Sequence, residues 1–184
     1  MILTLTSQQM LQTWRLCAGL ESLASDCSVE RFDGVDLDSR LKELMRQWYL
    51  SMLDEGDPAM VGTPTDARPL VSSTNDGYTA SISCQSSVRR LTRIRLSEWQ
   101  REAAVVDREA VADLLPLQSN PFARAGVCDP IAWREPDGSV KAIPSSAASR
   151  IVSASAIIDP GDDTYRLDER ALSTINDYLS KHFL

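Results

Sequence analysis

The stretch that most constrains the fold alternates arginine with aliphatic residues: residues 88–99 read VRRLTRIRLSEW. Ile94 and Leu96 alternate with Arg93 and Arg95, and a period of two is typical of a strand with one buried and one exposed face. The pattern therefore predicts a half-buried strand on which Arg93 and Arg95 share the exposed face.

The chain that follows, residues 97–115, admits two interpretations. Propensity alone favours a helix opened by Ser97 and Glu98, because apolar residues recur at helical spacing: Leu96, Trp99, Ala103, Val106, Ala110 and Leu114. The alternative is that the strand continues through Trp99 towards Val105 and Val106.

Further strands are indicated on both sides of this stretch. Residues 69–71 and the alternating run 78–84 flank Asn75-Asp76-Gly77, which predicts a hairpin. Residues 131–135 and 139–143 flank Pro136-Asp137-Gly138, a strong turn signal. Residues 150–158 form one more strand, whereas residues 118–127 are polar and marked by Pro and Gly, as in a loop.

Helices are expected at both ends of the chain. Thr6 or Ser7 can cap a first helix whose apolar residues are Met10, Leu11, Trp14, Cys17, Ala18 and Leu20. A second helix starts near residues 37–38, with the apolar stripe Leu41, Leu44, Met45, Trp48, Tyr49 and Met52, and stops at Gly56. Asp168 can cap a last helix that bears Ala171, Leu172, Ile175, Tyr178 and Leu179.

The predicted fold class is therefore α+β: N-terminal helices, then an antiparallel sheet or sandwich-like core, then a C-terminal helix. Residues 1–60 are the expected helical region, and residues 66–184 the expected β-rich region with its closing helix. Since a chain of 184 residues fits one domain, we expect the two regions to form one compact unit.

Composition narrows the function classes. The net charge of -7 and the pI near 4.7 argue against a free-standing nucleic-acid binder, which usually has a basic balance. The first residues show no charged segment followed by an apolar stretch, so we expect neither a signal peptide nor a membrane span. Small apolar neighbours of Cys17 and Cys84 suggest buried free thiols in a reducing compartment.

No catalytic, cofactor or metal motif is apparent, so we expect a protein that is not an enzyme. His182 is the one histidine and lies near the end of the chain, which leaves no base for a Ser-His-Asp arrangement. The four cysteines lack the close spacing of zinc ligands. The acidic residues of segments 33–38 and 159–163 lack the spacing of a calcium loop, and turn formation and helix capping explain them.

One group of residues departs from the general acidity, and its members are Arg89, Arg90, Arg93, Arg95 and Arg101. A solvated sheet face or internal ion pairs would account for it. Charge-assisted docking onto an acidic partner or a neighbouring copy would also do so, as would direct phosphate contact. Only Trp99 is an aromatic neighbour, which argues against a platform for stacking single-stranded bases.

The order of these predicted elements and sequence motifs resembles that of head–tail ring proteins from Bacteroides-infecting tailed phages, the crAss-like group and its relatives. In those proteins an arginine-bearing strand leads to a tryptophan, an Asn-Pro-Phe/Tyr stretch, a Pro-started hairpin, a strand ending in Pro and a last helix. The resemblance covers about residues 66 to 183, with the helix from Leu167. Its matching residues are Arg89, Arg90, Leu96, Trp99, Asn120, Pro121, Phe122, Arg124, Pro130, Ser145 and Pro160.

The resemblance implies a structural connector without an active site or cofactor. Its partners would be copies of itself in a cyclic ring of about twelve, the portal protein, other neck or tail proteins, and DNA that passes without specific binding. Such a protein is assembled in the host cytoplasm and resides in the virion at the head–tail junction. For residues 97–115 it favours a bent strand to about Val106 and a short helix only after Asp107.

Interface residues follow from the arginine group and the matching motif together: Arg89, Arg90, Arg93, Arg95, Trp99, Arg101, Asn120 and Phe122. Two rival functions remain. One is a small regulatory nucleic-acid-binding protein that uses the Arg89–Arg101 cluster. The other is a magnesium-dependent hydrolase that uses acids such as Asp159 and Asp162.

Overall fold

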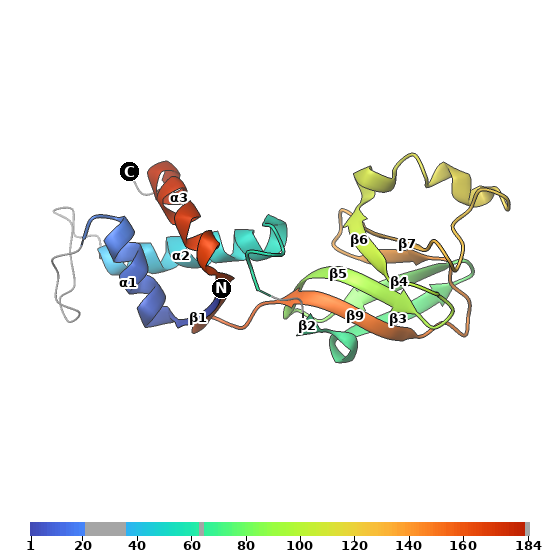
Figure 1. The fold of residues 1–184 in the computed structure, drawn as a ribbon, viewed down its shortest axis with the longest axis horizontal. Coiled ribbons are helices and arrows are strands. Elements are labelled where there is room, and N and C mark those ends of the chain that lie inside the picture. Colours follow the sequence, from blue (N-terminus) through green and yellow to red (C-terminus); the bar gives the residue numbers. More distant parts are fainter. Residues whose placement is uncertain (21–35, 63–64, 183–184) are drawn as a thin grey trace. The chain divides into compact units, whose positions relative to one another are not determined.

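The computed structural model describes residues 1–20, 36–62 and 65–182. The chain divides into two compact units, each described here by itself. Met1–Thr63 and Asp159–Leu184 form a helical unit, and Pro64–Ile158 form a β-rich unit inserted between them (Figure 1). The α+β class is confirmed, with helices first, strands next and a helix last.

Local side-chain bonds set where the helices of the helical unit begin. A capping box opens α1 (Ser7–Cys17): Thr6 Oγ1 accepts from the Gln9 amide at 3.3 Å, and Gln9 Oε1 accepts from the Thr6 amide at 2.9 Å. Asp36 caps α2 (Leu37–Glu55), whose first residue agrees with the start expected near residues 37–38. Asp168 caps a 3-10 helix, Glu169–Ser173, that leads into α3 (Thr174–His182).

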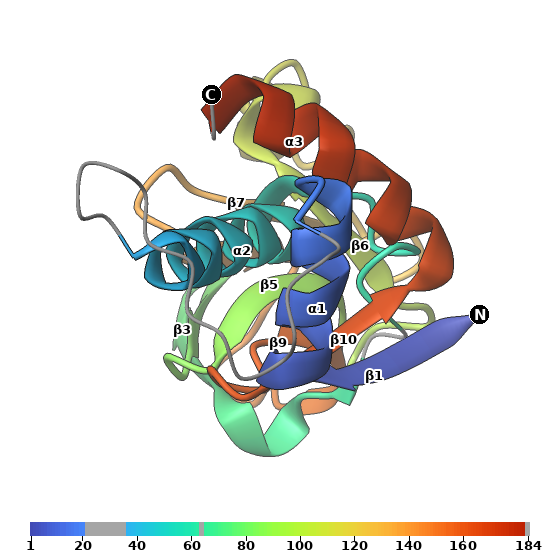
Figure 2. The ribbon, with the colours of Figure 1, turned by 90° about the vertical axis from the view of Figure 1, so that its left-hand side faces the viewer.

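Aromatic residues fill the core of the helical unit, where α1, α2 and α3 meet (Figure 2). The Trp14 ring lies edge-on to Trp48 and to Tyr178, with centroids 5.9 and 6.1 Å apart. Such edge-to-face pairs add about 0.5–1.5 kcal/mol beyond the area they bury. The predicted stripe of α2 is confirmed, with Met52 at its margin and Leu53 fully buried.

A two-stranded sheet joins the two ends of the chain. β1 (Ile2–Thr6) pairs antiparallel with β10 (Thr164–Asp168), in a register from Ile2 opposite Asp168 to Thr6 opposite Thr164. Because this pairing and the packing of α3 hold the last segment on the N-terminal helices, the expected β-rich region 66–184 is shorter in the structure. It ends at Ile158, and the two regions form two units rather than one.

An eight-stranded sheet makes up the β-rich unit, in the order β2-β9-β5-β6-β7-β8-β4-β3. Its strands are β2 (Thr65–Asp66), β3 (Val71–Asp76), β4 (Thr79–Cys84), β5 (Val88–Leu96), β6 (Ala103–Asp107), β7 (Ile131–Arg134), β8 (Val140–Ile143) and β9 (Ile151–Ile158). Both predicted hairpins, β3–β4 and β7–β8, are present. Neighbours are antiparallel except β6 and β7, which run parallel.

The inner face of this sheet carries one hydrophobic core. Ile94, Leu96 and Trp99 are at most 1% exposed, and alanines from five strands fill the space around them. The pairing of β5 with β9 contains register shifts, which leave the Ile94 side chain pointing into the core. Arg93 and Arg95 therefore point to the other face, as predicted.

Residues 97–115 do not form the helix that propensity favours. β5 ends at Leu96, a turn follows, and β6 then leads into a 3-10 helix, Arg108–Val111. Tertiary burial overrides propensity here: the Trp99 indole lies in the core, where its Nε1 donates to the Pro144 carbonyl at 2.7 Å. The extended chain with a short helix after Asp107 agrees with the resemblance, apart from the turn at residues 97–102.

Two further expectations concern the cysteines and membrane spans. Cys17 is half-buried, and Cys84 is exposed because it ends β4 beyond the core, so the prediction of buried thiols is wrong for both. Within the described ranges, no helix has the length and apolar character needed to cross a bilayer.

Replacing Ile94 by Ala should destabilise the β-rich unit by about 2–5 kcal/mol, because the side chain is fully buried. Arg93→Ala, its neighbour on the opposite face, is the matched control and should change stability by about 0.5 kcal/mol or less. Native-state hydrogen exchange of the β5 amides reports on this unit separately from the helical unit. Equal effects of the two substitutions would contradict the assigned faces of β5.

Acid should weaken the helical unit through Asp168. Hydrogen bonds from Arg170, through its Nε at 2.8 Å and its amide at 3.1 Å, and from the Met1 amino group at 3.0 Å lower the pKa of this carboxyl well below its usual range. A depressed folded-state pKa means that the stabilisation is present above the unfolded-state pKa of about 4 and is lost as pH falls below it. The gap in Tm between wild type and Asp168→Asn should therefore shrink from pH 7 to pH 3. A gap that stays constant would show that ionised Asp168 contributes nothing.

Candidate interaction surface

The connection between β6 and β7 is the most distinctive surface feature of the β-rich unit. Because these neighbouring strands run parallel, a tight turn cannot join them and the chain must cross back over the sheet. Residues 108–130 make this crossing, with two 3-10 helices, Arg108–Val111 and Pro116–Ser119. We call residues 108–130 the arm (Figure 1).

The base of the arm is packed against the sheet. Val111 and Ala125 are buried with Trp133 and Ile143 in a second small hydrophobic cluster. Tyr78, next to the β3–β4 turn, donates its hydroxyl proton to the Ala125 carbonyl, and the Arg124 guanidinium lies 4.5 Å from the centre of its ring. The base of the arm is therefore fixed at the turn end of that hairpin.

The distal part of the arm has its own hydrogen bonds. Asn120 Oδ1 accepts from the Phe122 amide at 3.0 Å, an Asx turn, and the Asn120 carbonyl accepts from the Arg124 amide at 2.9 Å. The side chain of Gln118 bridges the loop, accepting from the Ala125 amide at 2.8 Å and donating to the Leu114 carbonyl at 2.7 Å. These bonds set the position of Phe122 at the tip.

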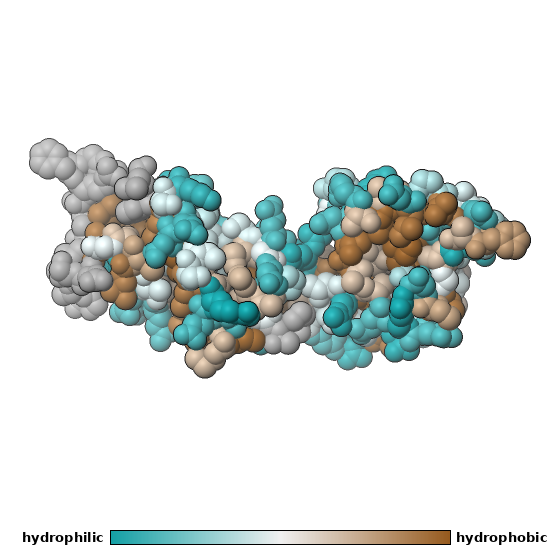
Figure 3. Space-filling view, turned by 45° about the horizontal axis from the view of Figure 1, so that its top comes forward, coloured by the Kyte–Doolittle hydropathy of each residue, from teal (hydrophilic) through white to brown (hydrophobic). Residues whose placement is uncertain are grey.

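Apolar side chains gather on the arm without a covering element. Phe122 is 99% exposed, and the other large apolar residues of the arm that face solvent are Leu114, Leu117 and Val127. In Figure 3, hydrophobic side chains cluster on the part of the β-rich unit from which the arm projects. Residues 114–123 contain no charged side chain, in a chain of which 24% is charged. Such a patch is typical of a protein interaction site.

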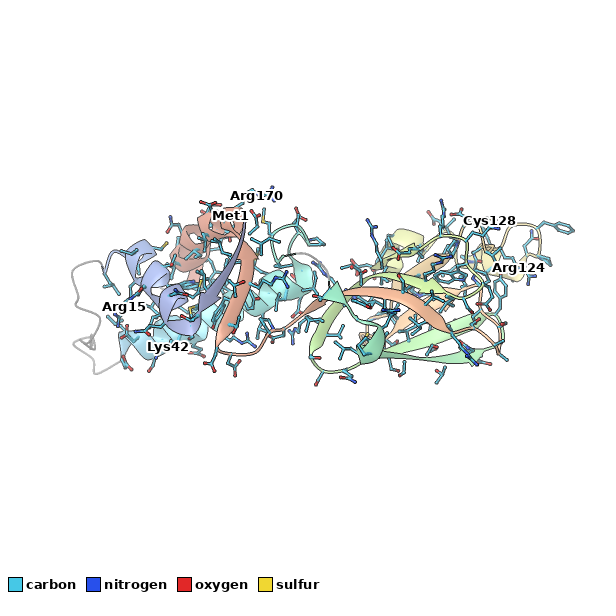
Figure 4. All side chains as sticks on the ribbon, turned by 60° about the horizontal axis from the view of Figure 1, so that its bottom comes forward. Met1, Arg15, Lys42, Arg124, Cys128 and Arg170 are labelled. Atoms are coloured by element: carbon cyan, nitrogen blue, oxygen red, sulfur yellow. The ribbon has the colours of Figure 1, made fainter. Side chains whose placement is uncertain are left out.

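The turn at residues 97–102 supports the arm from the other side. The Gln100 amide donates to the Val127 carbonyl at 2.9 Å, and Arg101 pairs with Asp129. Arg124 and Cys128, labelled in Figure 4, both belong to this part of the unit. Arg101 thus braces the arm and lies outside β5, which ends at Leu96.

Glu98, in the same turn, fastens the loop of residues 145–150. Its Oε1 accepts from Ser146 Oγ at 2.7 Å and also from Ser149 Oγ. Burial alone would raise the pKa of this carboxyl, but the hydrogen bonds from Ser149 and Ser146 outweigh it, and the pKa is lowered. A carboxylate held ionised by hydroxyl donors orders a loop and is poorly suited to act as a base.

The remaining arginines of the predicted group have diverse surroundings. Arg95 is half-buried and donates through Nε to the Trp99 carbonyl at 3.1 Å, while Arg89 and Arg90 are half-buried near the start of β5. Arg93 is exposed, and none of the described residues forms an ion pair with it. Four of the predicted interface residues are thus exposed: Arg93, Arg101, Asn120 and Phe122.

Trp99 is not available as an interface residue, because its ring is 1% exposed inside the core. Leu114 and Leu117 were missed, since Leu114 was considered part of a possible helix over residues 97–115 and Leu117 was assigned to no element. The run of uncharged residues 114–123 is the sequence signal that would have found them.

Described residues of the acidic segments form ion pairs. Arg46 pairs with Asp159 at 2.6 Å and with Asp162 at 3.0 Å, and Asp38 pairs with Arg15. Asp33 lies outside the described residues. In the described part of the chain, no group of three or more His, Cys, Asp or Glu is placed to hold a metal ion. His182 lies against the Tyr178 ring, with centroids 4.3 Å apart.

A polar hollow of about 380 Å³ lies between α1 and α2. Arg15 and Lys42 lie on its walls (Figure 4), together with Ser7, Gln8, Leu11, Gln12 and Asp38. Arg15 donates through Nε to Asp38 at 2.9 Å, so its charge is already paired, and Lys42 is the remaining cationic side chain among those that line the hollow.

Comparison with known proteins does not assign the chain to a family: no protein family model matches it, and no curated protein matches it significantly.

Tyr78→Phe should loosen the arm while keeping the ring that packs against it. Loss of the hydroxyl removes one hydrogen bond, worth about 0.5–1.5 kcal/mol, so amide exchange across residues 118–126 should rise roughly two- to tenfold. Val152→Ala, an exposed position on β9, serves as the control and should leave this exchange unchanged. If Tyr78→Phe also left it unchanged, the arm would not be held by this contact.

Proposed function

We propose that this chain is a structural protein of a phage head–tail connector: a non-enzymatic ring component that joins portal and tail proteins and encloses the channel for DNA. The observation that carries the proposal is the arm, an ordered crossover whose apolar tip is presented to solvent. A protein whose role is assembly needs such a surface, because burial of apolar area drives most protein association.

Charge distribution supports the proposal. Residues 64–158 contain 11 Lys or Arg and 10 Asp or Glu, a net charge of +1, whereas the rest of the chain contains 8 and 16, a net charge of -8. In a ring, different faces of adjacent copies meet, and unequal charge on two units favours such unlike contacts. An acidic surplus also keeps DNA from adhering to a channel wall.

The order of sequence features gives further support. The arginine-bearing strand, Trp99, the Asn120-Pro121-Phe122 stretch, the hairpin and the last helix occur in the order seen in ring proteins of crAss-like phages. Two of these features have distinct roles in the fold: Trp99 builds the core, and Asn120 orders the turn that presents Phe122. On this proposal the protein is assembled in the host cytoplasm and incorporated in the virion.

The nucleic-acid-binding alternative has less support. It needs several arginines free to contact phosphates, but Arg95 donates to a backbone carbonyl and Arg101 is paired with Asp129. Arg93 is one exposed arginine on this face, and a phosphate site usually combines several.

Purified protein should form closed rings, or add a layer to the portal complex of the same phage, in negative-stain electron microscopy. Mass photometry over a concentration series gives the number of copies. A protein that stays monomeric at every concentration and never joins a portal would refute the proposal. DNA binding that falls steeply with salt would then favour the alternative.

A further inference from the structure

A small hollow lies at the open end of the β3–β4 hairpin, where Val71 is paired with Cys84. Its volume is about 180 Å³, and the lining combines apolar and small polar side chains: Pro69, Leu70, Val71, Ser72, Ser83, Cys84 and Gln85.

The size of the hollow suits one aromatic side chain. Sites for drug-sized ligands enclose roughly 300–1,000 Å³, well above this volume. An apolar cavity of about 150 Å³ is sufficient to bind benzene. A phenyl ring is therefore the kind of group that such a hollow accommodates.

The chemistry of the hollow matches the tip of the arm. None of the residues that line the hollow is charged, and residues 114–123 of the arm are uncharged too. Contact between the two would place uncharged side chains on both sides, and depletion of charge is typical of the centre of a protein interface. Phe122 is fully exposed at the tip, so its ring is not covered by any of the described residues.

The fold separates the tip and the hollow within one chain. The hollow lies at the open end of the hairpin, whereas Tyr78 fixes the arm at the turn end, near the Asp76–Thr79 pair. Strands of six residues span about 20 Å, which is the distance between these ends. Phe122 accordingly remains in solvent and leaves the hollow of its own chain open.

We propose that Phe122 of one copy inserts into the β3–β4 hollow of a second copy. The inference rests on the proposed function, for which it supplies the contact between neighbouring subunits. Tip and hollow are different surfaces, so the contact is heterologous, and repetition of a heterologous contact produces a ring when the rotation closes.

Cys84 in the hollow allows a direct test by disulfide trapping in the full chain. In a background with Cys17, Cys27 and Cys128 replaced by Ser, Ala123→Cys places a second thiol beside Phe122 at the tip and keeps the ring that makes the proposed contact. Oxidation with diamide should link Cys84 of one copy to the introduced thiol of the next, because disulfides form only between residues whose Cα atoms approach within about 7 Å. Since each copy carries one tip and one hollow, the expected product is a ladder of dimers, trimers and larger species on a non-reducing gel.

Two controls define the contact. Adding Cys84→Ser should abolish the ladder. Ser119→Cys in place of Ala123→Cys puts the thiol on the same arm but away from Phe122, and it should link much less. Linking that survives Cys84→Ser as dimers alone would show a symmetric tip-to-tip contact and overturn the proposal. Equal linking from position 119 would also overturn it.

The affinity of self-association, measured without cross-linking, tests the same contact. Phe122→Ala should weaken self-association by about 10- to 100-fold, as expected for loss of a buried Phe side chain. Val152→Ala, an exposed apolar residue of β9, should leave it unchanged. If rings form normally in Phe122→Ala, this contact is refuted while the connector function stands. If wild-type protein forms no assembly by itself or with the portal, both fail.

Discussion

The parallel pairing of β6 with β7 is the constraint on which the architecture of the β-rich unit depends. It forces a long crossover in a sheet whose other neighbours are antiparallel. Crossovers usually contain a helix that packs back on the sheet, but here Val111 and Ala125 pack while the tip at Phe122 remains exposed. The apolar tip is thus a consequence of topology combined with a sequence of turns, Asn120 foremost, that holds it away from the core.

The second organising feature is the insertion of the β-rich unit into the helical one. Pairing of β1 with β10 brings both ends of the chain into the same unit, and Asp168 adds charge-assisted bonds to Arg170 and the Met1 amino group. This arrangement separates the charges as well: the helical unit contains the acidic surplus, while the β-rich unit is nearly neutral. Acids of the helical unit form internal pairs, such as Arg46 with Asp159.

Sequence periodicity was sufficient for elements whose pattern is local. The Asn75-Asp76-Gly77 hairpin, the capped first helix and the inward face at Ile94 were all predicted. The strands β1 and β10 were missed because each is short and is stabilised by a partner distant in sequence. For the same reason the helix favoured at residues 97–115 was wrong, since burial of Trp99 decides that segment.

The candidate site was predictable only in part. Phe122 and Asn120 were singled out by their motif, and Arg93 by strand alternation, whereas the burial of Trp99 and the pairing of Arg101 depend on tertiary contacts. The hollow at the β3–β4 hairpin has no sequence signature. It exists because the 3-10 helix Arg68–Leu70 brings Pro69 and Leu70 beside the end of β4.

Hydrogen exchange at increasing protein concentration tests the central claim, that the arm and the hairpin hollow are two halves of one contact between copies. The account predicts that amides of residues 117–124 and of residues 70–72 and 83–85 gain protection together, over the concentration range in which assemblies form. Assembly that adds protection to neither segment, or to the arm but not to the hollow, would contradict it.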